Sequence, residues 1–403
     1  MSAPRVFLLA GEASGDRLGA ALMRGLRAEA PGVSFGGVGG EAMAAEGLES
    51  LFPMSDLSVM GFAEVVPHLA RIRRRLREAA DAVAAARPDA LVTIDAQVFA
   101  AMLAKRAKRR APGTARVHYV APTVWAWKPW RAKRAARTLD RMLALFPFEP
   151  PLFERHGLPC DFVGHPVVEK AQARDRAAEG ALRDSLGIPA EAPLLLVAPG
   201  SRASEVSRLL EPFGAAAARL AGRVPGLRAV VPLAPAVAGP VREAVAGWGL
   251  PVHSLEPVEG GFAAAEARKM AAFGAADAAL AASGSVTLEL AAVGTPVVVG
   301  YRVPRSTEFL VRRLVRLDTF TLTNIVLGER IVPEFVQDEC EPERLADALA
   351  PLLADTPERR RQVDGAGRLM AALGAGDGAP GARAARGVLR AIEERRSGPL
   401  PRA

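Results

Sequence analysis

The chain has 403 residues, half of them hydrophobic and 24% charged, with a formal net charge of +8. This is the composition of a globular protein of two or three domains, and it excludes a wholly disordered, collagen-like or coiled-coil chain. The two cysteines, Cys160 and Cys340, form no CxxC pair and have no histidine at metal-ligand spacing. We therefore expect no metal site, no disulfide framework and a reducing cytoplasm. No uncharged apolar run is long enough for a transmembrane helix, and Val6–Ala10 is too short for a signal peptide.

Short apolar runs alternate with longer amphipathic stretches, which predicts parallel strands covered by helices on both faces. A proline-rich stretch over residues 146–193 separates two such series and predicts a hinge. The first series of strands is expected at Val6–Ala10, Leu91–Ile94, Val117–Val120, Met142–Phe146 and Phe162–Val163, and the second at Leu194–Ala198, Ala229–Leu233, Ala278–Ala282 and Pro296–Tyr301. The main helices are expected at Asp16–Ala30, Leu69–Ala86, Val98–Arg109, Glu205–Leu220, Ser285–Ala292, Ser306–Val315, Pro342–Leu353 and Pro357–Leu373. The sequence thus predicts two Rossmann-like α/β domains, over residues 1–165 and 166–345, followed by C-terminal helices and a frayed tail over residues 346–403.

The positive charge is concentrated in one region. Residues 71–141 contain 18 Lys and Arg against 5 Asp and Glu, a net of +13, whereas the rest of the chain has 34 against 39, a net of −5. Such a region favours nucleic acid, an anionic membrane or a phosphorylated substrate as partner. Three tryptophans nearby, at positions 125, 127 and 130, suit either a membrane interface or stacking on bases.

One stretch of this region has the pattern of an amphipathic helix. Its apolar residues recur at spacings of three and four, with arginines between them, so it is either a core-packed helix with a solvated face or a helix that lies in a membrane interface. The apolar members are Phe62, Val65, Val66, Leu69, Ile72 and Leu76, and the central arginines are Arg73, Arg74 and Arg75.

The first half carries polar groups where its strands are expected to end. Gly11-Glu12-Ala13-Ser14-Gly15-Asp16 follows the first strand, where glycines permit close approach of a ligand and Ser14 or Asp16 could instead cap the next helix. Asp95 follows the second buried strand, which suits a general base towards a sugar hydroxyl or a helix cap. His118 is a core residue or a substrate contact, and His165 lies at the expected hinge.

The second half carries two loops typical of phosphate binding. Gly200-Ser201-Arg202 joins a strand to a long helix, where backbone N–H groups, the helix dipole and an arginine favour an anion. Ser283-Gly284-Ser285 follows another strand, and Glu289 lies one helical turn further on, in position to accept hydrogen bonds from ribose hydroxyls.

Taken in order, these motifs resemble the lipid-A-disaccharide synthase family over roughly residues 5–350. The resemblance is carried by 11–16, 59–65, 118–127, 162–166, 199–202, 283–289, 299–302, 323–324 and 338–340. It implies a two-Rossmann GT-B glycosyltransferase whose domains face a cleft, with no cofactor or metal. The implied reaction joins UDP-2,3-diacylglucosamine to 2,3-diacylglucosamine 1-phosphate through a β-1,6 bond and releases UDP, in lipid A biosynthesis.

The resemblance also implies roles for residues. It makes Asp95 the base, with Glu12 and Asp16 as further carboxylate candidates and Ser14, Gly15, His118 and His165 on the acceptor side. It places Arg202, Ser283, Ser285, Glu289 and Asn324 on the UDP side. It further implies a cytoplasmic enzyme bound peripherally to the inner membrane, and it is compatible with a homodimer. The alternatives are another GT-B enzyme that uses a UDP-sugar, such as a peptidoglycan glycosyltransferase or a 2-epimerase, and a basic nucleic-acid-binding protein.

Overall fold

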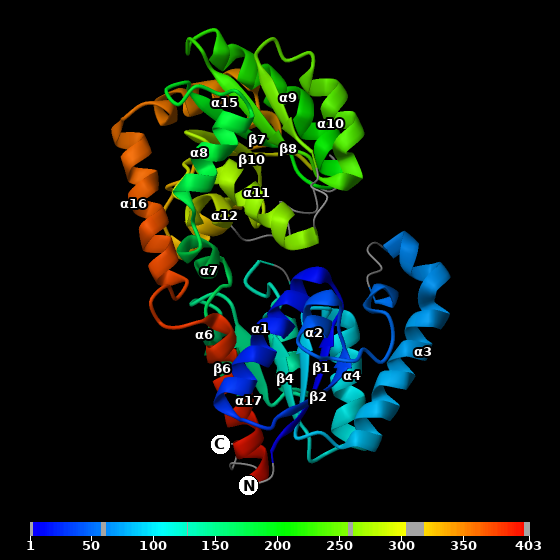
Figure 1. Ribbon diagram of the computed structural model, residues 1–403. Helices are drawn as coiled ribbons and strands as arrows, with labels where there is room; N and C mark the ends of the chain where they lie inside the picture. The colour runs from blue at the N-terminus through cyan, green and yellow to red at the C-terminus, as the bar shows by residue number, and fades with distance from the viewer. Residues whose placement is uncertain (1–2, 58–61, 127, 257–260, 304–317, 399–403) are drawn as a thin grey trace. The chain divides into compact units, whose positions relative to one another are not determined.

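A computed structural model describes residues 3–57, 62–126, 128–256, 261–303 and 318–398, with the side chains of 62–68, 261 and 262 left aside. The chain forms two compact units (Figure 1). The first contains Met1–Pro166 and Leu373–Ala403, and the second contains Val167–Ala372. This grouping differs from the expected separate part over residues 346–403, because the C-terminal segment is shared between the two units.

The first unit is built on a six-stranded parallel sheet in the order β2-β1-β3-β4-β5-β6. Alternate residues of each strand face opposite helical layers. In β1, Leu8 packs in the core on the side of α1 and α17, whereas Leu9 packs on the side of α3 and α4. The strands are β1 (Arg5–Ala10), β2 (Ser34–Val38), β3 (Ala90–Ile94), β4 (Ala115–Tyr119), β5 (Arg141–Ala144) and β6 (Cys160–Phe162). The helices are α1 (Ala13–Glu29), α2 (Glu41–Ala45), α3 (Phe62–Ala86), α4 (Gln97–Arg110), α5 (Trp130–Ala136), α6 (Pro150–Glu154) and α17 (Pro380–Arg396).

The C-terminal helix α17 completes the first unit by packing directly against α1 (Figure 1). Glycines allow the two helix backbones to touch. A Cβ at Gly25 would lie 2.5 Å from the carbonyl oxygen of Gly381, and one at Gly381 would lie 2.6 Å from that of Ala21. Val388 and Ile392 then enter the same core as β1 and β3.

The second unit has a six-stranded parallel sheet in the order β12-β11-β10-β7-β8-β9. This is the arrangement of a dinucleotide-binding Rossmann fold, in which the order reverses between the first and fourth strands. The strands are β7 (Leu194–Ala198), β8 (Arg228–Pro232), β9 (Val252–Leu255), β10 (Ala278–Ala282), β11 (Val297–Tyr301) and β12 (Glu334–Val336). The helices are α7 (Val167–Gln172), α8 (Arg176–Ser185), α9 (Ala203–Ala221), α10 (Ala238–Val245), α11 (Gly261–Ala275), α12 (Val286–Ala292), α14 (Leu322–Leu327), α15 (Pro342–Leu349) and α16 (Pro357–Ala372).

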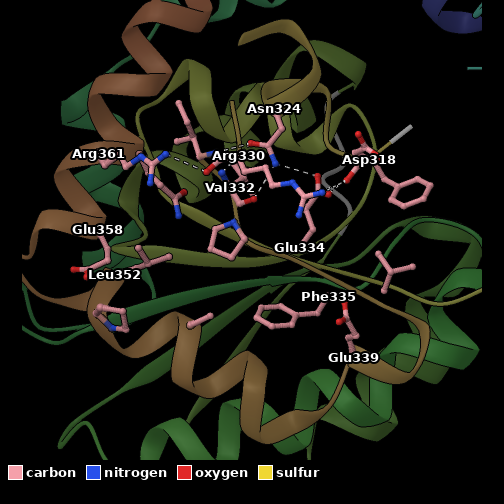
Figure 2. A pocket seen from close by; sticks show the side chains of 17 residues that line it. Asp318, Asn324, Arg330, Val332, Glu334, Phe335, Glu339, Leu352, Glu358 and Arg361 are labelled. Atoms are coloured by element: carbon pink, nitrogen blue, oxygen red, sulfur yellow. Dashed lines mark hydrogen bonds between the residues drawn. The ribbon is translucent and has the colours of Figure 1, made fainter. Parts of the chain in front are cut away.

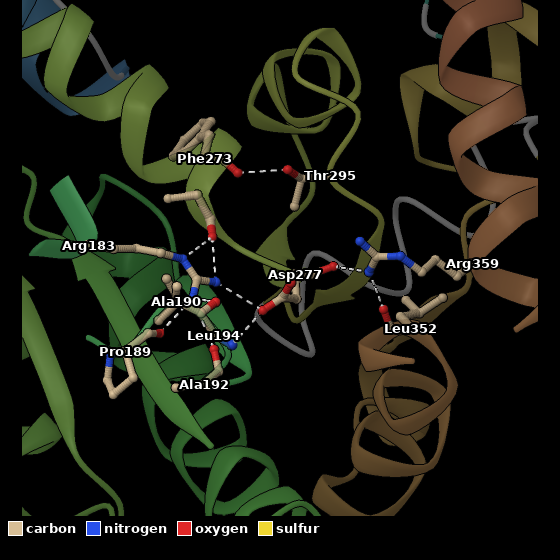
Figure 3. A network of polar contacts seen from close by, with 11 residues as sticks. Arg183, Pro189, Ala190, Ala192, Leu194, Phe273, Asp277, Thr295, Leu352 and Arg359 are labelled. Atoms are coloured by element: carbon tan, nitrogen blue, oxygen red, sulfur yellow. Dashed lines mark hydrogen bonds and ion pairs between the residues drawn. The ribbon is translucent and has the colours of Figure 1, made fainter. Parts of the chain in front are cut away.

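A polar network holds the amino ends of the central strands of this sheet (Figure 3). The Asp277 carboxylate accepts hydrogen bonds from the Leu194 amide at 2.8 Å and from the Arg183 guanidinium at 3.1 Å. The Asp277 carbonyl accepts one from Arg359 on α16. Because the strands are parallel, this network fixes their amino ends together, and loops follow their carboxyl ends.

The expected central strands are confirmed, and three edge strands, β2, β9 and β12, were not predicted. β2 is an edge strand of the first sheet, and β12 and β9 are the two edge strands of the second, so each has one neighbouring strand in its sheet. Gly36 and Gly37 lie within β2. A Cβ at Gly37 would lie 1.8 Å from the Leu8 carbonyl oxygen, so only glycine fits this strand. The expected helix Ser306–Val315 lies outside the described residues.

Candidate functional site

Each sheet brings two of the sequence motifs to its switch point, the place where the strand order reverses. Ligands of doubly wound sheets bind beyond the carboxyl ends of the strands at this place. In the first unit the switch point lies between β1, followed by Gly11–Asp16, and β3, followed by Asp95. In the second it lies between β7, followed by residues 199–202, and β10, followed by residues 283–285.

Asp95 has the setting of a reactive carboxylate. It is half-buried, and this burial raises the pKa of its carboxyl group. Its backbone has a φ of +52° and that of Ala96 a φ of +44°. Two consecutive non-glycine residues in the left-handed region are strained, and such strain concentrates at functional sites.

The loop after β1 lies directly against Asp95. A Cβ at Gly11 would lie 2.7 Å from the Ala96 Cβ, and one at Gly15 would lie 3.3 Å from the Ile94 carbonyl oxygen. Glycines at both places therefore let the start of α1 approach the end of β3. Glu12 precedes α1, and Ser14 is exposed in its first turn.

Asp16 is engaged in the scaffold. It is 4% exposed, and its carboxylate accepts hydrogen bonds from the amides of Gly40 at 2.7 Å, Ala42 at 2.8 Å and Met43 at 3.1 Å. These are the unpaired amides at the start of α2, so Asp16 holds α2 against α1. Glu12 and Asp95 are better placed than Asp16 to contact a substrate.

The two histidines of this unit differ in role. His118 lies inside β4, where its Nδ1 is 2.8 Å from the Thr93 hydroxyl, and burial lowers its pKa to about 4. It is therefore a neutral core residue. His165 follows β6 and lies 5.4 Å from the Phe146 ring, at the carboxyl edge of the sheet.

A buried carboxyl group that the sequence does not predict lies at the same edge. Glu149 is 1% exposed, and burial raises its pKa to about 7. It accepts hydrogen bonds from the Phe146 amide at 3.0 Å and the Trp125 indole at 3.4 Å. Trp125 packs edge-on against Phe148. To predict this group, the sequence would have to show that Glu149 is buried. A single glutamate beside prolines does not show this.

In the second unit, the two phosphate-type loops line one cavity of about 650 Å³. Gly200 has a φ of +115°, a conformation that favours glycine. Arg202 immediately precedes α9, its side chain is 65% exposed, and its guanidinium lies 3.0 Å from Glu205 Oε1. An exposed arginine held at the start of a 19-residue helix suits a phosphate group.

The second loop lines the same cavity. Gly284 has a φ of +156°, and Ser285 is exposed at the start of α12. The Ser283 hydroxyl donates a hydrogen bond to the Phe320 carbonyl at 3.0 Å. Glu289 lies one turn into α12, and Lys170, Glu266 and Lys269 surround it. These three charged residues were not predicted, because they come from α7 and α11 and share no local motif.

Asn324 lies elsewhere, beside a second cavity of about 610 Å³ (Figure 2). It is 2% exposed, and its Oδ1 accepts hydrogen bonds from the amides of Ile331 and Val332, both at 2.9 Å. Its Nδ2 donates to the Val332 carbonyl at 2.9 Å and to Glu334 Oε1 at 3.2 Å. The structure therefore does not bring Asn324 into the cavity of the phosphate-type loops.

The amphipathic helix α3 combines core and surface residues. Leu76 is 2% exposed and Ile72 packs beside it in the core, so neither forms the outer surface. Leu69 is 41% exposed, and Arg73 and Arg74 are exposed after it. Phe62, Val65 and Val66 have side chains outside the described ones. Arg75 is tied to Asp56 and Glu78, both at 2.7 Å, and lies 4.7 Å from the Phe52 ring.

Within the described ranges, no helix is both long and apolar enough to cross a bilayer. In the same ranges, no group of three or more His, Cys, Asp or Glu side chains is arranged to hold a metal ion.

Comparison with known proteins agrees with this geometry. Among solved structures, a putative UDP-N-acetylglucosamine 2-epimerase from Listeria monocytogenes aligns with a TM-score of 0.65 at 14% identity, over 98% of this chain and 97% of the other. The calicheamicin glycosyltransferase CalG4 aligns with a TM-score of 0.58 at 18% identity, over 99% of this chain and all of the other. Two Rossmann-like units with sites at their switch points define the GT-B class of glycosyltransferases and epimerases.

The sequence comparisons identify the family within that class. Residues 6–377 match the family described as lipid-A-disaccharide synthetase. The lipid-A-disaccharide synthase of Ruegeria pomeroyi is 51% identical over 391 residues, which cover 96% of this chain and 94% of the relative. The chain belongs to the lipid-A-disaccharide synthetase family and is a glycosyltransferase.

Proposed function

We propose that the protein joins UDP-2,3-diacylglucosamine to 2,3-diacylglucosamine 1-phosphate and releases UDP, which is the condensation step of lipid A biosynthesis. The observation that carries the proposal is the convergence of both phosphate-type loops and Glu289 on one cavity of about 650 Å³. Family membership supports the acylated substrates. Likeness to the 2-epimerases is limited to the fold, and a nucleic-acid-binding protein would leave this cavity unexplained.

The second unit binds the UDP group in this proposal. The start of α9 and Arg202 stabilise the diphosphate, whose charge increases as the sugar–phosphate bond breaks. Ser283, Gly284 and Ser285 supply further donors from the facing loop, and Glu289 accepts hydrogen bonds from the ribose. Asn324 acts from outside this cavity by holding residues 331 and 332.

The first unit binds the acceptor and supplies the base. When the 6-hydroxyl oxygen attacks the anomeric carbon, Asp95 takes its proton, the bond from that carbon to the β-phosphate oxygen breaks, and UDP leaves with the electron pair. Attack opposite the leaving group inverts the anomeric carbon. The raised pKa of Asp95 makes it a stronger base than an exposed aspartate. Glu12, Ser14 and Gly15 lie beside it, and His165 lies at the same edge, as acceptor-side contacts.

Product formation tests the proposal directly. The protein is incubated with both acylated substrates, and disaccharide 1-phosphate is measured by mass spectrometry. Loss of one stabilising donor costs about 3 kcal/mol of barrier, so Arg202→Ala should lower kcat at least about a hundredfold. Loss of the general base in Asp95→Asn should also lower kcat at least about a hundredfold. Arg208→Ala, on the same helix but outside the cavity, and Asp81→Asn, on the surface of α3, are the matched controls. Absence of disaccharide with the wild type would refute the function, and full activity of either site variant would refute its assignment.

Membrane association is part of the proposal, because diacylated substrates reside in a bilayer. The exposed Leu69 and the neighbouring Arg73 and Arg74 form the described part of the contact surface, on the cytoplasmic face of the inner membrane. Basic side chains near anionic headgroups each contribute on the order of 1 kcal/mol, and the attraction weakens with salt.

A further inference from the structure

Four charged side chains form a closed ring at the cavity of the second unit, which Glu266, Lys269 and Glu289 line. The Lys170 ammonium contacts Glu266 Oε1 and Glu289 Oε1. The Lys269 ammonium lies 3.0 Å from Glu266 Oε2 and 3.0 Å from Glu289 Oε1. The ring links three elements, because Lys170 belongs to α7, Glu266 and Lys269 to α11, and Glu289 to α12.

The two carboxylates of the ring are not equivalent. Both oxygens of Glu266 are occupied, one by each lysine. In Glu289 both lysines contact the same oxygen, Oε1, and among the described residues Oε2 accepts no hydrogen bond. A carboxylate oxygen with unused lone pairs is an acceptor for hydroxyl donors. Glu289 therefore retains accepting capacity towards the cavity, whereas Glu266 has little left.

The lysines also hold the Glu289 carboxylate in one orientation. The Glu289 side chain is 15% exposed, and a carboxylate this buried is costly unless it is paired. Two ammonium groups on one oxygen restrict rotation of the carboxylate more than one group would. Lys269 is additionally held over the Phe273 ring, at 5.8 Å.

We propose that Lys170 and Lys269 are positioning residues that hold Glu289 Oε1 and thereby present Oε2 to a ribose hydroxyl of the nucleotide. This inference rests on the proposed UDP site and adds to it two residues that act through Glu289, of which Lys269 also lines the cavity. It also assigns Glu266 a purely internal role, as the counter-charge that keeps both lysines in place.

Nucleotides that lack a ribose hydroxyl test this inference. Binding of UDP, 2′-deoxy-UDP and 3′-deoxy-UDP is measured by calorimetry for the wild type, Lys170→Met and Lys269→Met. A hydrogen bond to a charged group changes affinity by about tenfold or more. The wild type should bind UDP about tenfold more tightly than at least one deoxy analogue. Each lysine variant should lose most of that preference while its affinity for the deoxy analogue changes less than about twofold.

A control variant and the opposing outcomes distinguish a positioning role of the lysines from a general loss of nucleotide binding. Lys108→Met makes the same chemical change in the first unit and should retain the wild-type preference. Equal weakening of all three nucleotides in both lysine variants would overturn the inference, since it would show a loss of fold or of overall charge. A wild type that binds UDP without distinguishing the hydroxyls would overturn it as well. A wild type that binds none of the nucleotides would instead overturn the proposed function.

Discussion

Glu149 should make the stability of the first unit depend on pH in a direction unusual for a carboxylate. Burial raises its pKa from 4.5 to about 7. Between these values the folded state binds a proton that the unfolded state does not, so stability is greatest below pH 4.5 and falls as the pH rises to 7. At 1.36 kcal/mol per pKa unit, the loss amounts to roughly 3 kcal/mol.

The variant Glu149→Gln isolates this contribution, because glutamine stays neutral at every pH. Any cost that the amide itself adds does not depend on pH. We therefore expect the free energy of unfolding of the variant minus that of the wild type to be about 3 kcal/mol larger at pH 8 than at pH 4.5. Trp125, Trp127 and Trp130 lie in the first unit, and Trp248 is the fourth tryptophan. Denaturant unfolding followed by tryptophan fluorescence in a Trp248→Phe background therefore reports on the first unit. A difference that stays constant within about 1 kcal/mol over this range would refute the burial argument.

His118 should act in the opposite direction over nearly the same range. Burial lowers its pKa from 6.5 to about 4, so the unfolded state binds the extra proton and stability falls as the pH drops from 6.5 to 4. In the wild type the two contributions largely cancel between pH 4.5 and 6.5. His118→Asn removes the histidine contribution. The free energy of unfolding of this variant minus that of the wild type should therefore increase by roughly 3 kcal/mol as the pH falls from 6.5 to 4.

Three further changes have outcomes set by packing and charge. Gly25→Ala should destabilise the first unit by about 1–3 kcal/mol, measured by denaturant unfolding, because its Cβ would lie 2.5 Å from the Gly381 carbonyl. Asn324→Ala should lower the melting temperature, since it leaves the buried amides of residues 331 and 332 unpaired, while UDP affinity of the folded protein changes less than about threefold. The double substitution Arg73→Glu and Arg74→Glu should lower the affinity for anionic vesicles, measured by co-sedimentation, at least about tenfold. Arg75→Gln should instead mainly reduce stability, because Arg75 is tied to Asp56 and Glu78.

The central strands and both phosphate-type loops were predictable because their signals are local. A buried parallel strand is a continuous apolar run, and a loop that approaches a ligand contains glycine. The edge strands β2 and β12 were not predictable for the same reason. β2 contains Gly36 and Gly37, and β12 is a three-residue strand that includes Glu334, so neither has an apolar run.

The site residues likewise divide into those with a local sequence signal and those without one. Arg202 and Glu289 lie within motifs, whereas Lys170, Glu266 and Glu149 gain their surroundings only when distant segments pack together. Asp16 and Asn324 show the converse. Each lies in a motif of the family, yet hydrogen bonds to nearby backbone groups occupy its side chain. Spacing in the sequence identifies which residues matter and does not separate those that contact a ligand from those that hold a loop.

The return of α17 to the first unit has a consequence for how the chain folds as it is synthesised. The second unit is one continuous segment, Val167–Ala372, so all of it is synthesised before the last helix, α17. The first unit begins at the amino terminus but lacks Val388 and Ile392 in its core until α17 has been made. The amino-terminal domain is therefore the last to be completed. A variant that ends after residue 372 and is released from the ribosome should have a protease-resistant second unit and a protease-sensitive first one.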